Sequence, residues 1–290
     1  MRYFLNSIWM LFVVGSFTLQ AQDEFQGKAM YQSKTKLALD LSSSGIPADR
    51  IKMIEERMKS RMERTYELNF NKTASIYKEE AQLENTGGRG GMRMMIFGGA
   101  GSGDYYKNIQ TKKSATENEF SGKNFLIKDD LTTYDWKMEQ ETKMIGQNLC
   151  FKATTVIDLP SQNMQMQFGR RGQNRDNKEE EENRPEEPVM EPTIVTAWYT
   201  MDIPVGHGPD DFWGLPGLIL EVSYQNTSIL CTKIVMNPKE KKDIKEPTKG
   251  KEVTQEAYDA IVREKMEEMR ERMQNERQKG GSGHRIMIRG

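Results

Sequence analysis

The feature that most constrains the fold is a series of short segments in which apolar and polar residues alternate. From residue 105 onward, the segments YYKNIQTKKSATENEF, KNFLIKD, YDWKMEQETKMI and NLCFKATTVI follow one another with short turns between them. Consecutive strands joined by tight turns are typical of an antiparallel meander rather than of alternating strands and helices. Three later segments, TIVTAWYTM, GLILEVSY and TSILCTKIVM, continue the pattern, and TYELNFNKTASIYK predicts a hairpin that turns at Asn71 and Lys72.

Two regions have the periodicity of amphipathic helices instead. The first spans residues 48–63, and its apolar positions are Ile51, Ile54, Met58 and Met62. The second spans residues 254–278, with Thr254 as its predicted N-cap and an apolar face of Tyr258, Ile261, Val262, Met266, Met269 and Met273. The chain is therefore predicted to be an α+β protein. Its antiparallel sheet should curl into an open barrel or half-barrel with flanking amphipathic helices.

The first 21 residues are predicted to be a secretory signal peptide. Arg2 precedes an apolar stretch at residues 8–19, and a small residue, Ala21, stands before the expected cleavage point. The apolar stretch is short for a membrane span, although an uncleaved anchor is the alternative. We therefore expect a protein that is exported to the periplasm or associates with the outer membrane, and that does not span a membrane after cleavage.

The rest of the chain is predicted to form one main domain with two polar insertions. The β-rich domain covers residues 22–253 and contains a glycine-rich loop at 86–104 and an acidic insertion at 169–192 that lacks the apolar residues needed for packing. A flexible tail, residues 279–290, follows the C-terminal helix.

The charge balance excludes one class of function. The net charge is −1, and removing Arg2 with the signal peptide changes it to −2. Broad nucleic-acid binding needs a basic face, so no nucleic-acid partner is expected.

The two cysteines, Cys150 and Cys231, both fall in strand-like segments. An oxidising compartment permits a disulfide between them, and we predict that they pair. The alternative is two buried free thiols that behave as small hydrophobic residues.

The longest apolar run follows directly after the stiffest part of the chain. The connector IPVGHGPDDFWGLPG carries three prolines and leads into the strand LILEV. Gly214 and Gly217 are the positions where a positive φ is expected. In the strand, Leu218, Leu220 and Val222 should share one face and Ile219 and Glu221 the other, as in a central strand that is buried on both sides.

This region also resembles a known family. The residues Gly214, Leu215, Pro216, Gly217, Leu218 and Ile219 reproduce the signature of the GLPGLI family, which is found in exported proteins of Bacteroidetes, and TKMIGQNLCFKATT resembles its second signature. The resemblance covers most of residues 25–237. It implies an exported protein without known catalytic residues or cofactor, and some members are encoded near outer-membrane receptors of the TonB-dependent type.

Three kinds of function remain open from the residues themselves. The favoured one is a non-enzymatic binding module for an envelope protein, such as a TonB-dependent receptor, or for an apolar ligand, without a cofactor. Its predicted contact residues are Phe212, Trp213, Trp198 and Glu221, although Phe212 and Trp213 are also candidates for the core.

The second possibility is copper binding by thioether clusters, with Met92, Met94 and Met95 as the main candidates and His207 as a further possible metal ligand. The third is a hydrolase or metal enzyme that uses His207 with the acids Asp210, Asp211 and Glu221. The enzyme is disfavoured because no nucleophile–base pair is visible in the sequence.

Overall fold

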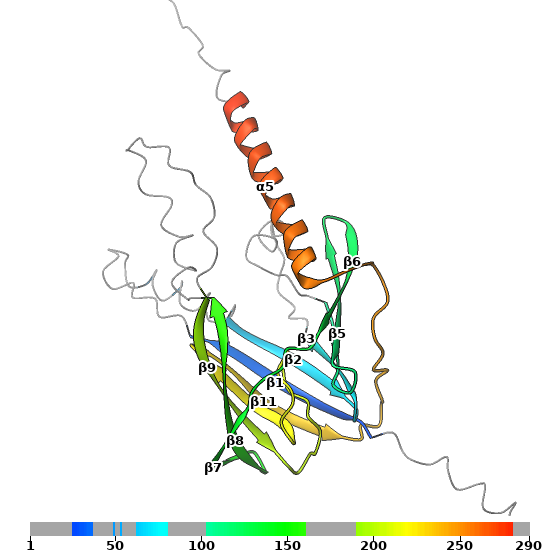
Figure 1. Cartoon of the computed structure of the whole chain (residues 1–290), viewed down its shortest axis with the longest axis vertical. Coiled ribbons are helices and arrows are strands. Elements are labelled where there is room, and N and C mark those ends of the chain that lie inside the picture. Colours follow the sequence, from blue (N-terminus) through cyan, green and yellow to red (C-terminus); the bar gives the residue numbers. More distant parts are fainter. Residues whose placement is uncertain are drawn as a thin grey trace, which may run out of the picture.

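The computed structural model describes residues 25–36, 62–80, 103–160 and 190–280, together with Asp49 and Met53. These residues form twelve strands and one long helix, which are coloured along the chain in Figure 1. The strands are β1 (Gly27–Thr35), β2 (Glu63–Phe70), β3 (Ala74–Glu79), β4 (Tyr105–Asn108), β5 (Lys113–Phe120), β6 (Lys123–Asp130), β7 (Lys137–Ile145), β8 (Asn148–Pro160), β9 (Met190–Thr200), β10 (Leu218–Tyr224), β11 (Thr227–Met236) and β12 (Lys251–Val253); the helix is α5 (Gln255–Gly280).

All twelve strands belong to one open sheet. Their order is β12-β6-β5-β4-β3-β2-β1-β11-β10-β9-β8-β7, and every pair is antiparallel except β12 with β6. The two halves of the meander are joined by β1, which pairs with both β2 and β11. The predicted antiparallel sheet and its open edges are confirmed, and the hairpin at Asn71 and Lys72 is the β2–β3 turn.

The sheet bends around the connector between β9 and β10. Five strand spacings separate β4 from β10, which is ~24 Å in a flat sheet. Nevertheless Lys107 of β4 donates a hydrogen bond to the backbone oxygen of Phe212, and the Phe212 ring lies 5.9 Å from the ring of Tyr224 in β10. A short chain of contacts therefore crosses from one part of the sheet to the other, and the connector fills the space that the bend encloses.

Flanking helices are not what the structure shows. Thr254 caps α5, as predicted, because its hydroxyl accepts a hydrogen bond from the Ala257 amide at 3.2 Å. Tyr258 and the neighbouring Ile261 and Val262 then pack on β5 and β6, and the rest of the helix projects away from the sheet (Figure 1). No helix among the described segments has the length and apolar character needed to cross a membrane.

The first predicted helix, residues 48–63, lies almost wholly outside the described residues. Asp49, Met53 and Met62 have helical backbone, and Glu63 already belongs to β2. The signal peptide lies outside the described residues, as do the glycine-rich loop except residues 103 and 104 and the C-terminal tail except residues 279 and 280, which are the end of α5. The predicted acidic insertion overlaps β9, which begins at Met190.

The two cysteines are buried free thiols, so the predicted disulfide is not present. Both side chains belong to the same apolar cluster, Cys150 from β8 and Cys231 from β11. Burial raises the pKa of the Cys150 thiol to about 11 and that of Cys231 to about 12. Neutral, desolvated thiols of this kind act as small hydrophobic side chains, the alternative that the sequence had left open.

Candidate functional site: the connector between β9 and β10

The connector, residues 201–217, doubles back on itself and is held by backbone hydrogen bonds at both ends. The Leu218 amide donates to the Ile203 oxygen at 2.9 Å, and the Ile219 amide donates to the His207 oxygen at 3.0 Å. Between these anchors, His207 and Trp213 form an isolated antiparallel bridge. The segment is thus a folded plug rather than an extended loop, with Ile203, Val205, Phe212 and Leu215 buried in the core.

The two glycines of the GLPG turn are needed for different reasons. Gly214 has a φ of 94°, a conformation that side chains with a Cβ rarely adopt, as predicted. Gly217, in contrast, is not among the positive-φ residues. A Cβ on Gly217 would lie 1.9 Å from the Thr200 backbone oxygen, so the close approach of the chain to β9 requires glycine there.

The strand after the turn does not alternate as predicted. A bulge shifts the β9–β10 register between Ile219 and Glu221, so that Leu220 is an extra residue. As a result Ile219 and Val222 belong to one apolar cluster, whereas Leu218 and Leu220 belong to another. Burial of the strand on both faces, however, is confirmed, because Leu218, Ile219, Leu220 and Val222 are all buried.

A buried lysine fastens the connector to the opposite part of the sheet. Lys107 of β4 has no exposed surface, and its ammonium donates hydrogen bonds to the backbone oxygens of Gly208 at 2.9 Å, Phe212 at 3.0 Å and Asp210. Burial lowers the pKa of Lys107 to about 8, while Asp210 and Asp211 act in the opposite direction. The side chain is therefore charged at neutral pH, and all three of its donors are used.

His207 is buried beside this clamp. Its Nε2 lies 3.1 Å from the Asn71 backbone oxygen, its Nδ1 has no hydrogen-bond partner, and its ring lies 6.1 Å from that of Phe70. Burial, reinforced by the Lys107 charge, lowers the pKa of His207 to about 3. The imidazole is therefore neutral at physiological pH and has no access to solvent.

The two aspartates of the connector differ from one another. Tyr134 donates a hydrogen bond of 2.5 Å to Asp211. Asp210 reaches solvent, although crowding by packed atoms and the nearby Asp211 raise its pKa. The backbone of Asp210 has a φ of 53°, which is uncommon for a residue other than glycine, and its carbonyl is one of the three that bind Lys107. The Lys107 contact helps to hold this conformation.

Two indole rings lock the connector to the β6–β7 linker. Trp136 donates a hydrogen bond of 2.9 Å to the Trp213 oxygen, and Trp213 donates one of 2.8 Å to the Thr132 oxygen. Phe212 is buried between Tyr134, Trp136 and Tyr224, with ring centroids 5.4–6.5 Å apart. Phe212 thus occupies the core, which was the alternative to a contact role, while Trp213 is half-buried.

The other two predicted contact residues form a separate group. Trp198 of β9 and Glu221 of β10 are cross-strand neighbours. Lys143 of β7 joins them, because its ammonium lies 4.2 Å from the Trp198 ring centroid and 2.7 Å from Glu221. Since adjacent strand residues point to opposite faces, Glu221 lies on the other face of β10 from Val222. The four predicted contact residues therefore do not form one site.

Several important residues were not predicted. Lys107 was missed, although the alternation in YYKN places it on the same strand face as Tyr105, where an inward lysine needs acceptors.

Met92, Met94 and Met95 lie outside the described residues, so their proposed role stays a prediction. Among the described residues, no group of three or more His, Cys, Asp or Glu side chains could hold a metal ion.

A family model matches part of the chain. Residues 136–221 match the family described as "Protein of unknown function (Porph_ging)". The match includes β7, β8, β9 and the connector, and it contains the GLPGLI residues 214–219. It therefore covers the connector and the three strands that precede it along the chain. A search of curated proteins found no match.

Two solved structures are similar over a larger span. They are described as "Structure of PNGF-II in C2 space group" and "Structure of PNGF-II in P21 space group", with 13% and 12% sequence identity and TM-scores of 0.46 and 0.45. Each similarity covers 82% of this chain, but only 32% and 33% of the other protein. At TM-scores below 0.5 these similarities do not establish a shared fold.

Proposed function

We propose that the chain is an exported, non-enzymatic binding module of the cell envelope. Its N-terminal sequence and its GLPGLI signature support export, and the match to a family of unknown function over residues 136–221 is compatible with that signature. The proposed partner is an outer-membrane protein, such as a TonB-dependent receptor, or an apolar ligand.

The observation that carries the non-enzymatic part of this proposal is that the polar groups at the centre of the connector are either buried or held in hydrogen bonds within the fold. The Lys107 ammonium donates its three hydrogen bonds to backbone carbonyls, and His207 is neutral and buried. Asp211 accepts a hydrogen bond from Tyr134. A general base must reach the proton that it abstracts, and a buried, neutral His207 with no path to solvent is poorly suited to that task. The connector is better explained as a structural plug.

The same packing argues that binding uses the outside of the molecule. Phe212 and Leu215, from the aromatic turn that could have formed the rim of an interior ligand site, are 3% and 2% exposed. Space inside the bend of the sheet is therefore occupied by the protein's own side chains. A ligand or partner must bind to surfaces that the plug leaves open.

Native mass spectrometry of the chain purified from the envelope, with metal analysis of the same sample, tests this function. We expect an N-terminus at Gln22 and an additional bound mass, either a small ligand or a second protein, without stoichiometric metal. Copper in a 1:1 ratio would contradict the proposal and support the methionine clusters. Recovery of the chain only from the cytoplasm, with its first 21 residues intact, would contradict export.

A further inference from the structure

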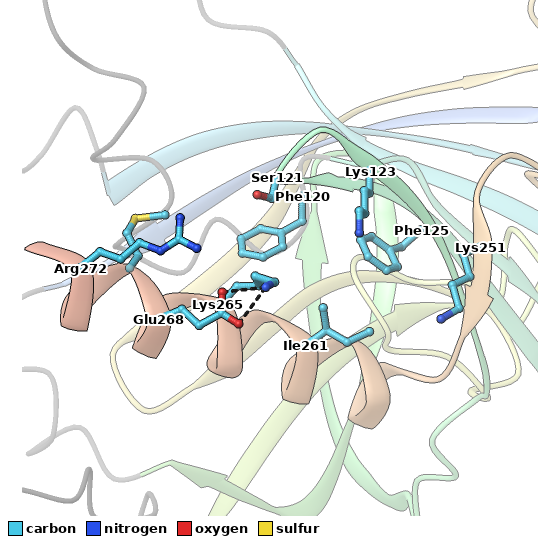
Figure 2. A pocket seen from close by; sticks show the side chains of 10 residues that line it. Phe120, Ser121, Lys123, Phe125, Lys251, Ile261, Lys265, Glu268 and Arg272 are labelled. Atoms are coloured by element: carbon cyan, nitrogen blue, oxygen red, sulfur yellow. Dashed lines mark hydrogen bonds and ion pairs between the residues drawn. The ribbon is translucent and has the colours of Figure 1, made fainter.

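Helix α5 and the β5–β6 hairpin enclose a half-open groove, shown in Figure 2. Its volume is about 530 Å³. Phe120 and Phe125 form the hairpin wall, and Ile261 and Met269 line the helix wall. Tyr258 fixes the base, because its ring lies edge-on to those of Phe125 at 5.4 Å and Phe120 at 6.4 Å. We refer to this feature as the α5 groove.

The rim of the α5 groove is basic. Four cationic side chains border it, against one acidic side chain, Glu268; the four are Lys123, Lys251, Lys265 and Arg272. Lys265 is paired with Glu268 at 2.7 Å. Within the described parts of the chain, Lys123 and Lys251 have no ion-pair partner. The chain as a whole has a net charge of −1, so this accumulation of positive charge beside an apolar floor is local rather than general.

We propose that the α5 groove binds an anionic amphiphile with a single alkyl chain. The alkyl chain would lie against Phe120, Phe125 and Met269, and the anionic head would contact Lys123 and Lys251. An apolar floor with a few charged groups at its edge is the usual composition of a small-molecule site. This inference rests on the proposed binding function and names its ligand class.

The size of the groove favours a small ligand over a macromolecule. Its volume lies within the range of about 300–1,000 Å³ found for ligand sites. A stable protein interface buries about 800 Å² on each partner, which is more than a groove of this size offers. The helix surface outside the groove is densely charged, with Arg263, Glu264, Glu267 and Arg270 all exposed. Charge-dense surfaces are depleted from the centres of protein interfaces.

Equilibrium dialysis of the purified chain with radiolabelled palmitate, below the concentration at which palmitate aggregates, tests the inference. We expect saturable 1:1 binding, and affinity that is about tenfold weaker for 1-monopalmitoylglycerol, which has the same alkyl chain without the charge. Two paired substitutions locate the site. Lys123→Glu with Lys251→Glu should weaken binding about tenfold. Lys137→Glu with Lys233→Glu makes the same charge change at exposed positions of β7 and β11 and should have no effect.

A second pair of variants tests the apolar wall and does not change the charge. Met269→Ala should weaken palmitate binding several-fold, and Met266→Ala, one turn earlier on the same helix but outside the groove, should leave it unchanged. Circular dichroism of each variant verifies that α5 is intact.

Three results would overturn the inference: no palmitate binding, binding that the groove variants do not alter, or a concentration-dependent dimer that the groove variants abolish. The last would identify a second copy as the occupant. If palmitate fails but the envelope-purified chain carries another bound mass, only the ligand class is wrong. If neither is found, the binding function fails as well.

Discussion

The connector and helix α5 are attached to the same sheet in opposite ways. The connector lies inside the bend of the sheet. Lys107 binds its backbone oxygens, Trp213 is hydrogen-bonded to the β6–β7 linker, and its apolar side chains are buried. Among the described side chains, helix α5 packs on the sheet through Tyr258, Ile261 and Val262, and the helix then projects away from the sheet (Figure 1). The difference indicates that the connector stabilises the fold, whereas the part of α5 after Val262 adds little to it and borders the α5 groove as far as Arg272.

The strongest test of this comparison removes the ammonium that holds the connector. Lys107→Met should lower the free energy of unfolding by about 3–5 kcal/mol, because three carbonyl oxygens, two of them in buried contacts, lose their donor. Lys113→Met, which removes an exposed ion pair with Asp130, is the control and should cost less than about 1 kcal/mol. Urea denaturation measures both. Equal losses for the two variants would mean that Lys107 is not a clamp.

The next largest effect is expected at the GLPG turn. Gly217→Ala should cost about 2–4 kcal/mol, because the new Cβ would collide with the Thr200 backbone. Gly214→Ala should cost less, about 1–2 kcal/mol, since it strains φ but has space for the methyl group. The same denaturation experiment compares them. The reverse order would show that the positive φ at Gly214 requires glycine more strongly than the close approach of Gly217 to β9 does.

Burial of His207 predicts a specific acid sensitivity. Its pKa in the folded chain, about 3, is below its unfolded value of 6.5, so between these values the unfolded state binds more protons and stability falls as the pH decreases. Between pH 7 and pH 5 this group should remove about 2 kcal/mol from the free energy of unfolding.

The variant His207→Gln isolates this contribution. Its stability should decrease less between pH 7 and pH 5 than that of the unmodified chain, and the difference between the two curves cancels the contribution of Asp210, whose raised pKa acts in the opposite direction. Parallel curves would mean that His207 titrates normally and that the connector opens to solvent.

Features that depend on neighbouring residues could be predicted from the sequence, and features that join distant residues could not. The meander was predictable because alternation along a strand reports burial on one face, and the cap at Thr254 because it depends on neighbouring residues alone. The Lys107 clamp was not predicted, because it joins positions more than a hundred residues apart. Cys150 and Cys231 were wrongly paired for the same reason: two strand cysteines can share a core without adopting disulfide geometry.

The bulge at Leu220 explains a second error. Strict alternation would have placed Val222 with Leu218, but one extra residue in β10 moved Val222 to the cluster that contains Ile219 and Phe212. The predicted contact residues were then divided between two locations, with Phe212 in the core and Trp198 beside Lys143. Only the contacts of the folded chain show that Phe212 packs in the core whereas Trp198 packs against Lys143.

The smallest effect is expected at the far end of α5. Ending the chain after Arg272 removes the part of the helix beyond the groove, and the free energy of unfolding should change by less than about 0.5 kcal/mol, because the packed side chains Tyr258, Ile261 and Val262 remain. Tyr258→Ala, in contrast, should cost about 3 kcal/mol, since a side chain that is only 3% exposed leaves a cavity between Phe120 and Phe125. Urea denaturation of both variants completes the comparison. A large loss on truncation would show that the end of α5 is part of the fold, and the contrast between a packed connector and a projecting helix would then be wrong.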